Sequence, residues 1–153
     1  MSQTFQGFNE DTYKFLIELA FNNNKEFFAA NKGRYKQNVQ EPLRALAEDL
    51  LPLALTIDPC FNTRMTTILS RIYRDTRFTK DNAWLAFRRP GKRLGESFLI
   101  YVEICPQGYG YGLGMHESNQ AMMANLRKRI LADPVGFLAL AQAPALAKYP
   151  LEG

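Results

Sequence analysis

The spacing of apolar residues divides the chain into a helical first part and an extended second part. Up to about residue 55, apolar side chains recur every three or four positions, which predicts helices over about 10–22 and 25–55. Asn9 is placed to cap the first of these helices. The run Asn22-Asn23-Asn24 is expected to end that helix and to cap the next one, which starts at Lys25.

Proline residues modify the second helical stretch. Proline inside a helix removes a hydrogen bond and clashes with the carbonyl four residues back. Pro42 therefore predicts a break or kink near Gln40 or Glu41, followed by a helix from Pro42 towards Leu50. Pro52 and Pro59 are expected to bound the exit of that helix.

From Arg64 onward the apolar residues alternate with a period of two, which predicts β-strands. The predicted strands are Thr66 to Arg74, Ala83 to Arg89, Ser97 to Cys105 and Tyr109 to Met115. Their short connections imply antiparallel neighbours. In the third strand Phe98, Ile100, Val102 and Ile104 are expected to face the core, and Leu99, Tyr101, Glu103 and Cys105 the other side.

The fourth predicted strand has glycine at every second position, namely Gly108, Gly110, Gly112 and Gly114. One face of it would be bare backbone, which permits either a closely packed helix or loop, the commoner case, or a ligand lying against the sheet. The pattern is not a dinucleotide-binding fingerprint, because these glycines lie within a strand and do not open a helix.

Two further helices are predicted after the strands. Ser118 is expected to cap a helix that runs to about Asp133, and Asp133-Pro134 to start another through about Gln142. The chain is thus expected to be one α+β domain over 1–153. Its antiparallel sheet of four or more strands would be covered by the N-terminal helices and a C-terminal helix.

The composition is that of a globular protein with a core rich in aromatic rings, since 46% of the residues are hydrophobic and eleven Phe accompany seven Tyr. Met1 to Glu10 lacks the basic start and apolar run of a signal peptide, and no apolar stretch is long enough to span a membrane, so a cytoplasmic protein is expected. Cys60 and Cys105 are then expected to be unpaired thiols. With one histidine, His116, and no paired Cys-x-x-Cys, neither a metal site nor another cofactor is predicted.

Positive charge is concentrated in one segment. Residues 64–93 contain nine Lys or Arg against two Asp, a net charge of +7, whereas the other 123 residues sum to −3. Such a focused positive field favours phosphates, nucleic acid or acidic protein partners. The alternative is a pair of strands with solvated basic faces and an exposed turn at Arg88-Arg89-Pro90-Gly91-Lys92-Arg93.

The centre of this segment, Arg71 to Asp81, combines cations, carboxylates and aromatic rings, and we call it the Arg-Asp block. Its candidate ligand-binding residues are Arg71, Tyr73, Arg74, Asp75, Arg77, Lys80 and Asp81. Guanidinium groups bind phosphate or carboxylate through two parallel hydrogen bonds, and a neighbouring Asp can orient them. In an extended strand Arg71 and Arg74 point to opposite faces, so they converge only if the turn at Asp75 to Thr79 folds them back.

Two other interpretations of the Arg-Asp block remain open. In the first, which the residues favour over an anion site, the domain is structural or binds a protein. There the arginines pair with helix carboxylates such as Glu41 or Glu48 to hold the fold, and Phe78 fills the core. In the second, Asp75 and Asp81 hold a metal in a hydrolase or nuclease, although no catalytic residue can be assigned.

Several motifs in order resemble the bacterial domain-of-unknown-function family 2461. They are Gly7-Phe8, the run from Asn22-Asn23-Asn24-Lys25-Glu26-Phe27-Phe28 to Ala29-Ala30-Asn31-Lys32 with Tyr35, Pro42-Leu43, and the Arg-Asp block. The resemblance spans almost the whole chain and implies no established activity.

The chain departs from the family pattern at two places. Asn82-Ala83-Trp84-Leu85 stands where family members usually carry a lysine, a proline and a tyrosine. The resemblance also implies that members tend to run some tens of residues further than Gly153, and a site shared with that part would be only half contained in residues 1–153.

Overall fold

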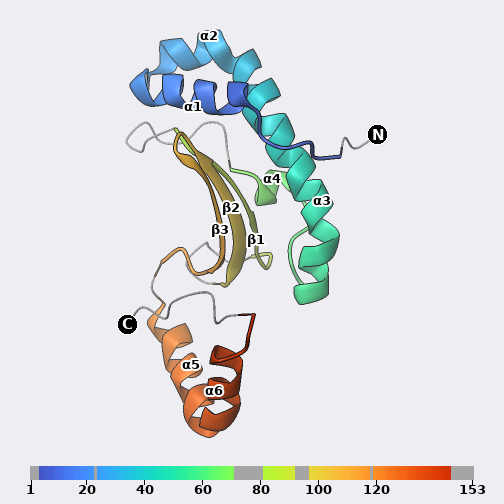
Figure 1. Cartoon of the computed structure of the whole chain (residues 1–153), viewed down its shortest axis with the longest axis vertical. Helices are drawn as coiled ribbons and strands as arrows, with labels where there is room; N and C mark the ends of the chain where they lie inside the picture. The colour runs from blue at the N-terminus through green and yellow to red at the C-terminus, as the bar shows by residue number, and fades with distance from the viewer. Residues whose placement is uncertain (1–3, 23, 71–80, 92–96, 118, 146–153) are drawn as a thin grey trace. The chain divides into compact units, whose positions relative to one another are not determined.

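A computed structural model describes residues 4–22, 24–70, 81–91, 97–117 and 119–145. These residues belong to two compact units, Met1–Glu117 and Ser118–Gly153. Figure 1 shows helices and an antiparallel sheet, as expected for an α+β fold.

The two N-terminal helices begin where their asparagine caps predicted. Helix α1 (Glu10–Phe21) is preceded by Asn9, whose side chain accepts a hydrogen bond from the Thr12 amide at 3.0 Å. Helix α2 (Lys25–Tyr35) is preceded by Asn24, which accepts from the Phe27 amide at 2.8 Å. Each cap satisfies a backbone donor that the first turn leaves without an intrahelical partner. The predicted helix starts are confirmed.

The predicted kink before Pro42 takes the form of a π-helical turn. The π-helix η1 (Lys36–Gln40) joins α2 to α3 (Glu41–Ile57), which carries Pro42 in its first turn. The expected exit at Pro52 is wrong, because α3 continues through that residue to Ile57. Leu51 and Leu55, which flank the proline, still pack against the core, so burial holds the last turns in place.

The sheet of the first unit is antiparallel with the order β1-β2-β3, comprising Ala83–Phe87, Leu99–Cys105 and Gly108–Gly114. Three strands occur among the described residues, so the prediction of four or more is corrected. Residues Met65–Ile68, where another strand was expected to begin, form the helical turn α4. Leu69 then makes a single bridge to Leu85, and 71–74 lie outside the described residues.

Local hydrogen bonds explain why this segment starts as a helical turn. The Asn62 side chain accepts from the Arg64 amide at 2.9 Å, and the Leu69 amide donates to the Met65 carbonyl at 2.9 Å. These bonds close the turn within the segment before any strand pairing begins.

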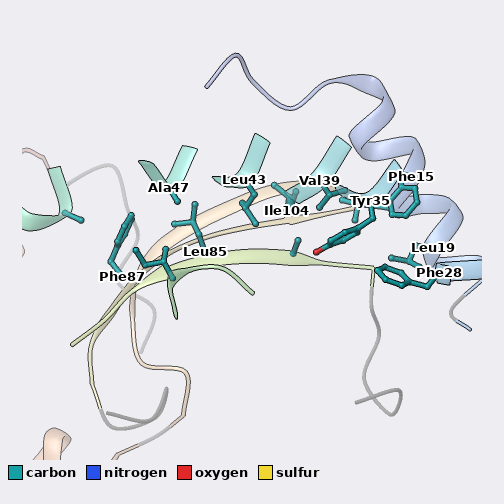
Figure 2. Packing of buried hydrophobic residues seen from close by; sticks show 14 of the residues in the cluster. Phe15, Leu19, Phe28, Tyr35, Val39, Leu43, Ala47, Leu85, Phe87 and Ile104 are labelled. Atoms are coloured by element: carbon teal, nitrogen blue, oxygen red, sulfur yellow. The ribbon is translucent and has the colours of Figure 1, made fainter. Parts of the chain in front are cut away.

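The core lies between the helices and one face of the sheet. Figure 2 shows Val39, Leu43 and Ala47 directed towards Leu85 and Ile104 of the sheet. A cluster of rings continues this core between α1 and α2, formed by Phe15, Phe28 and Tyr35. Apolar burial across these contacts is the main stabilising contribution that the first unit shows.

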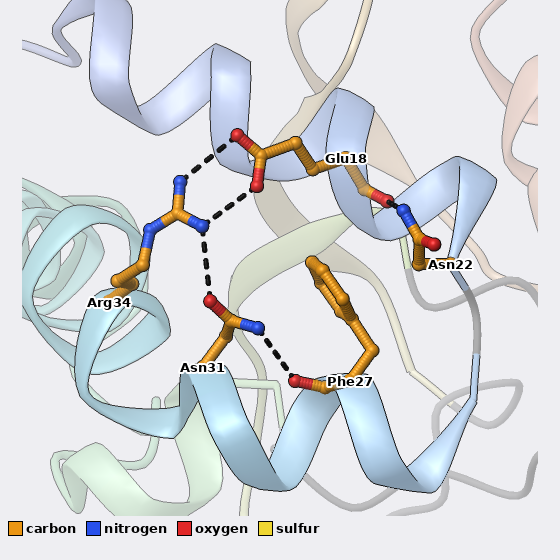
Figure 3. A network of polar contacts seen from close by, with 5 residues as sticks. All are labelled: Glu18, Asn22, Phe27, Asn31 and Arg34. Carbon is orange, nitrogen blue, oxygen red and sulfur yellow. Dashed lines mark hydrogen bonds and ion pairs between the residues drawn. The ribbon is translucent and has the colours of Figure 1, made fainter.

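The asparagine-rich motif, residues 22–32, takes part in a polar network on the surface of α1 and α2 (Figure 3). Arg34 donates to both carboxylate oxygens of Glu18, at 2.7 and 3.1 Å, and to the side chain of Asn31 at 3.1 Å. Asn31 donates in turn to the Phe27 carbonyl, and Asn22 to the Glu18 carbonyl, each at 2.9 Å. The motif therefore has a structural role, in which it caps helices and ties α2 to α1.

This network predicts a pH-dependent contribution to stability. The hydrogen bond from Arg34 holds the pKa of Glu18 below its ordinary value, so the folded state favours the ionised carboxylate. That contribution is present above the ordinary pKa and is lost as the pH falls through the lowered one. Glu18→Gln is expected to lower the melting temperature slightly at about pH 7, and the difference from wild type should disappear once the pH lies below the lowered pKa of Glu18. A difference that grows on acidification would contradict this assignment.

The second unit contains the helices α5 (Gln120–Ala132) and α6 (Pro134–Ala141). The cap of α5 is Asn119, which accepts from the Met122 amide at 3.1 Å, and not Ser118 as expected. Asp133 caps α6 as predicted, accepting from the Gly136 amide at 2.9 Å. The packing of a C-terminal helix over the sheet and the single-domain organisation stay predictions. No described helix is both long and apolar enough to cross a membrane.

Candidate functional site

The candidate site lies on the face of the sheet that points away from the core, which we call the open face. Because side chains alternate along a strand, Leu85 and Ile104 enter the core whereas Trp84 and Tyr101 lie on the open face. A cavity of about 340 Å³ opens there. It is lined by Asn82, Trp84, Ala86, Leu99, Tyr101, Glu103, Gly114, Met115 and His116.

The glycines of β3 border this open face. Strand pairing sets Glu103 beside Gly110 and Tyr101 beside Gly112. The Tyr101 ring leans over Gly112, so that a Cβ built on this glycine would lie 3.0 Å from the Tyr101 hydroxyl oxygen. A Cβ at Gly110 or Gly114 would meet no described atom within 4 Å. The bare backbone thus receives one tyrosine ring, and space remains on both sides of it.

The predicted alternation of β2 is largely confirmed. Ile100, Val102 and Ile104 pack against the core. Phe98 was expected to join them, but it is 45% exposed because it lies before the first paired residue, Leu99. The core-facing residues of β2 therefore begin at Ile100, two residues later than predicted.

Two hydrogen-bonded pairs hold the start of β1 at the edge of the cavity. Asn82 donates to the Glu103 carboxylate at 2.6 Å, which joins the residue before β1 to β2. The Ser70 amide donates to the Trp84 carbonyl at 2.8 Å, and the Trp84 amide donates to the Ser70 hydroxyl at 3.1 Å. Trp84 and Glu103 are also direct partners in the sheet register, so their backbones are fixed side by side.

Most of the Arg-Asp block lies outside the described residues, including the predicted site residues Arg71, Tyr73, Arg74, Asp75, Arg77 and Lys80, as well as Phe78. Its last member, Asp81, is described and is half-buried directly before Asn82. Ser70, the residue directly before the block, is hydrogen-bonded to Trp84. Both covalent ends of the block are therefore attached next to residues that line the cavity.

The first basic residues after β1, Arg88 and Arg89, include one that is paired with a carboxylate. Arg89 donates to Asp58 at 2.7 Å, and this guanidinium, together with the Cys60 amide, holds the pKa of Asp58 below its ordinary value. Among the described residues, Glu48 accepts from Arg44 at 3.0 Å and Glu41 lies 3.9 Å from Lys36. Arg89–Asp58 is thus one arginine–aspartate pair that joins the residues after β1 to the residue that follows α3.

Other candidate chemistry is sparse in the part of the chain that the structure describes. Cys60 and Cys105 are free thiols, as predicted. Within the described ranges, no three His, Cys, Asp or Glu side chains are grouped closely enough to hold a metal ion. His116 is exposed at the end of β3 and lines the cavity.

Comparison with protein families decides the relationship that the motifs suggested. The model of the conserved hypothetical protein family DUF2461 matches residues 11–153. The chain belongs to this family. The DUF2461 match includes the helices, the sheet with its open face and the Arg-Asp block. Neither curated proteins nor solved structures give a match to the chain.

The cavity of this DUF2461 protein adds residues that the sequence did not single out. Trp84 is the only tryptophan of the chain, and it falls on the opposite phase of β1 from Leu85 and Phe87. The alternation of side chains along β1 is enough by itself to place the indole on the open face. The cluster with Glu103 and Asn82 was missed because cross-strand register brings together residues 21 positions apart.

Proposed function

We propose that the protein is a binding module for an anionic, phosphate-bearing ligand, either free or part of a nucleic acid. The contacts to the anion are assigned to Arg71, Arg74, Arg77 and Lys80 with Tyr73, whereas Asp75 and Asp81 orient the cations. The observation that carries this proposal is the net charge of +7 over residues 64–93, in a chain whose remainder sums to −3.

The geometry around the ends of the block supports the proposal. Ser70 and Asp81 connect the block to the rim of a cavity that contains an indole, a phenol and hydrogen-bonding side chains. Small-molecule sites typically combine apolar and aromatic walls with a few polar groups, in volumes of roughly 300–1,000 Å³. A cation-rich segment whose two ends are attached at the edge of such a cavity suits a ligand with one anionic and one uncharged part.

A ligand panel tests this function by thermal shift at low and high salt. It contains phosphate, sulfate, pyrophosphate, nucleotides, short DNA and RNA, and divalent metals. Binding to the native state raises the melting temperature by mass action, so at least one phosphate-bearing ligand is expected to stabilise the protein. A nucleic acid would bind with an affinity that falls steeply with salt, whereas a compact phosphate site would saturate with one small ligand.

The double variant Arg74→Ala/Arg77→Ala is expected to lower the affinity for the ligand that stabilises the wild type by on the order of tenfold or more. The reason is that charge-assisted hydrogen bonds contribute roughly 1.5–3 kcal/mol each. The matched control is Arg127→Ala/Arg129→Ala, which removes the same charge from exposed positions on α5. Equal losses in both variants would indicate unspecific attraction to the net charge.

A structural role for the same block is the second candidate, and the Arg89–Asp58 pair favours it. In that case Arg74→Ala/Arg77→Ala would lower the melting temperature strongly while affinity stays unchanged, and no anion would stabilise the wild type. A response to divalent ions that a chelator reverses would instead favour a metal-dependent hydrolase or nuclease.

A further inference from the structure

The cavity on the open face has two aromatic walls and an open floor. Trp84 and Tyr101 come from neighbouring strands and lie on the same face, and Tyr101 pairs with Ala86, two residues along β1 from Trp84. Gly114 borders the cavity without a side chain, and a Cβ there would meet no described atom within 4 Å. Flat rings stack on such aromatic side chains, and bare strand backbone allows a ligand to approach closely.

The polar group best placed to select a ring is Glu103. Its Oε1 atom accepts from Asn82 at 2.6 Å, which fixes the carboxylate at the cavity wall. A carboxylate has two oxygens with about four acceptor positions, so the bond from Asn82 leaves capacity for further donors. An acceptor of this kind favours ring N–H and amino groups and repels phosphate.

These features define one class of ligand. It has a planar ring that stacks between aromatic walls, carries an amino group for the carboxylate, and keeps any phosphate away from Glu103. Guanine presents an adjacent N–H and amino group, and cytosine and adenine each present an amino group, whereas uracil and hypoxanthine lack one. The cavity of about 340 Å³ lies at the small end of ligand pockets and suits one base.

We propose that the open face binds the base of a nucleotide with an amino-bearing ring, stacked on Trp84 and Tyr101 and hydrogen-bonded to Glu103. This inference rests on the proposed function for the phosphate of the ligand, which that function assigns to the Arg-Asp block. The base belongs either to a free nucleotide or to a single strand, because both present the same ring and phosphate.

The test is a set of calorimetric titrations of the full chain with ligands that differ in one group. GMP is expected to bind at least about fivefold more tightly than IMP, and CMP than UMP, because each pair differs in the exocyclic amino group. Guanosine, which lacks the phosphate, should still bind. Comparing the affinity for a short phosphorylated oligonucleotide with that for GMP distinguishes a single strand from a free nucleotide as the ligand. As the only tryptophan, Trp84 also provides a fluorescence signal for wild-type titrations.

Variants then assign the contacts. Glu103→Gln should reduce the preference for GMP over IMP to less than about twofold. Trp84→Leu should lower the affinity for GMP by about tenfold or more. Tyr111→Leu is the control, since Tyr111 is 69% exposed and lies on the other face of the sheet. Equal affinities for GMP and IMP in the wild type overturn the inference without reference to any variant.

The two proposals fail in different ways. If pyrophosphate binds and Arg74→Ala/Arg77→Ala abolishes that binding, but the base adds no affinity, the proposed function stands and the base site is wrong. If guanosine binds as tightly as GMP and the double variant has no effect on either, the base site stands and the phosphate function of the block is wrong.

Discussion

Phe15→Ala is expected to cost the protein about 3–5 kcal/mol of its free energy of unfolding, the range for removing a fully buried ring from a core. Phe15 is 0% exposed. Its ring centroid lies 6.0 Å from that of Tyr35 and 6.4 Å from that of Phe27, and the Arg34 guanidinium lies 5.3 Å from it. Truncation therefore removes ring contacts to α2 as well as apolar burial. Urea unfolding measures the loss.

The matched control for this prediction is Phe21→Ala in the same helix. Phe21 is 85% exposed, so the change removes an equal ring without creating a cavity. Its effect is expected to stay within about 0.5 kcal/mol, as for surface substitutions away from specific contacts. Similar losses in the two variants would mean that α1 does not contribute its buried face to the core as described.

Gly114→Val is expected to abolish most ligand binding at the open face without lowering stability. The backbone at Gly114 is extended, and a Cβ there meets no described atom within 4 Å, so valine enters the strand without strain. Its branched side chain would occupy space in the cavity that Leu99 and Tyr101 also line. GMP affinity should fall about tenfold or more, while the free energy of unfolding stays level or rises by up to about 1 kcal/mol.

Leu113→Val provides the control for the glycine variant. Leu113 is the neighbouring residue of β3, is 68% exposed and lies on the other face of the sheet. This change alters the side chain of the same strand but leaves the cavity intact, so GMP affinity should be unchanged. Binding that survives Gly114→Val, or that falls equally in both variants, would show that the cavity is not the binding surface.

Local signals in the sequence were sufficient to predict the starts of α1 and α2 and the phase of β2 from Ile100 onward. Asn9 and Asn24 act as caps because a short polar side chain before an apolar period can bond the first amides of a helix. The inward set of β2 follows from strict alternation, since Ile104 and Glu103 must point to opposite faces. Such features depend on neighbouring residues and need no tertiary information.

Features that depend on tertiary packing were not predicted. Pro52 remains inside α3 because the leucines around it are buried against the core, which outweighs the local cost of proline. Residues Met65–Ile68 were expected to be extended but close a helical turn with their own amides and carbonyls. The cavity required cross-strand register, which the sequence between Trp84 and Glu103 does not encode locally.

The measurement that tests the central claim most directly is a two-dimensional amide correlation spectrum of the protein, recorded with and without GMP. Trp84 gives the only indole N–H signal of the chain, and it reports on the open face. The account predicts that GMP shifts this signal together with the amides of Tyr101, Glu103 and Gly114. An unchanged indole signal, or shifts confined to the helices of the core side, would contradict the account.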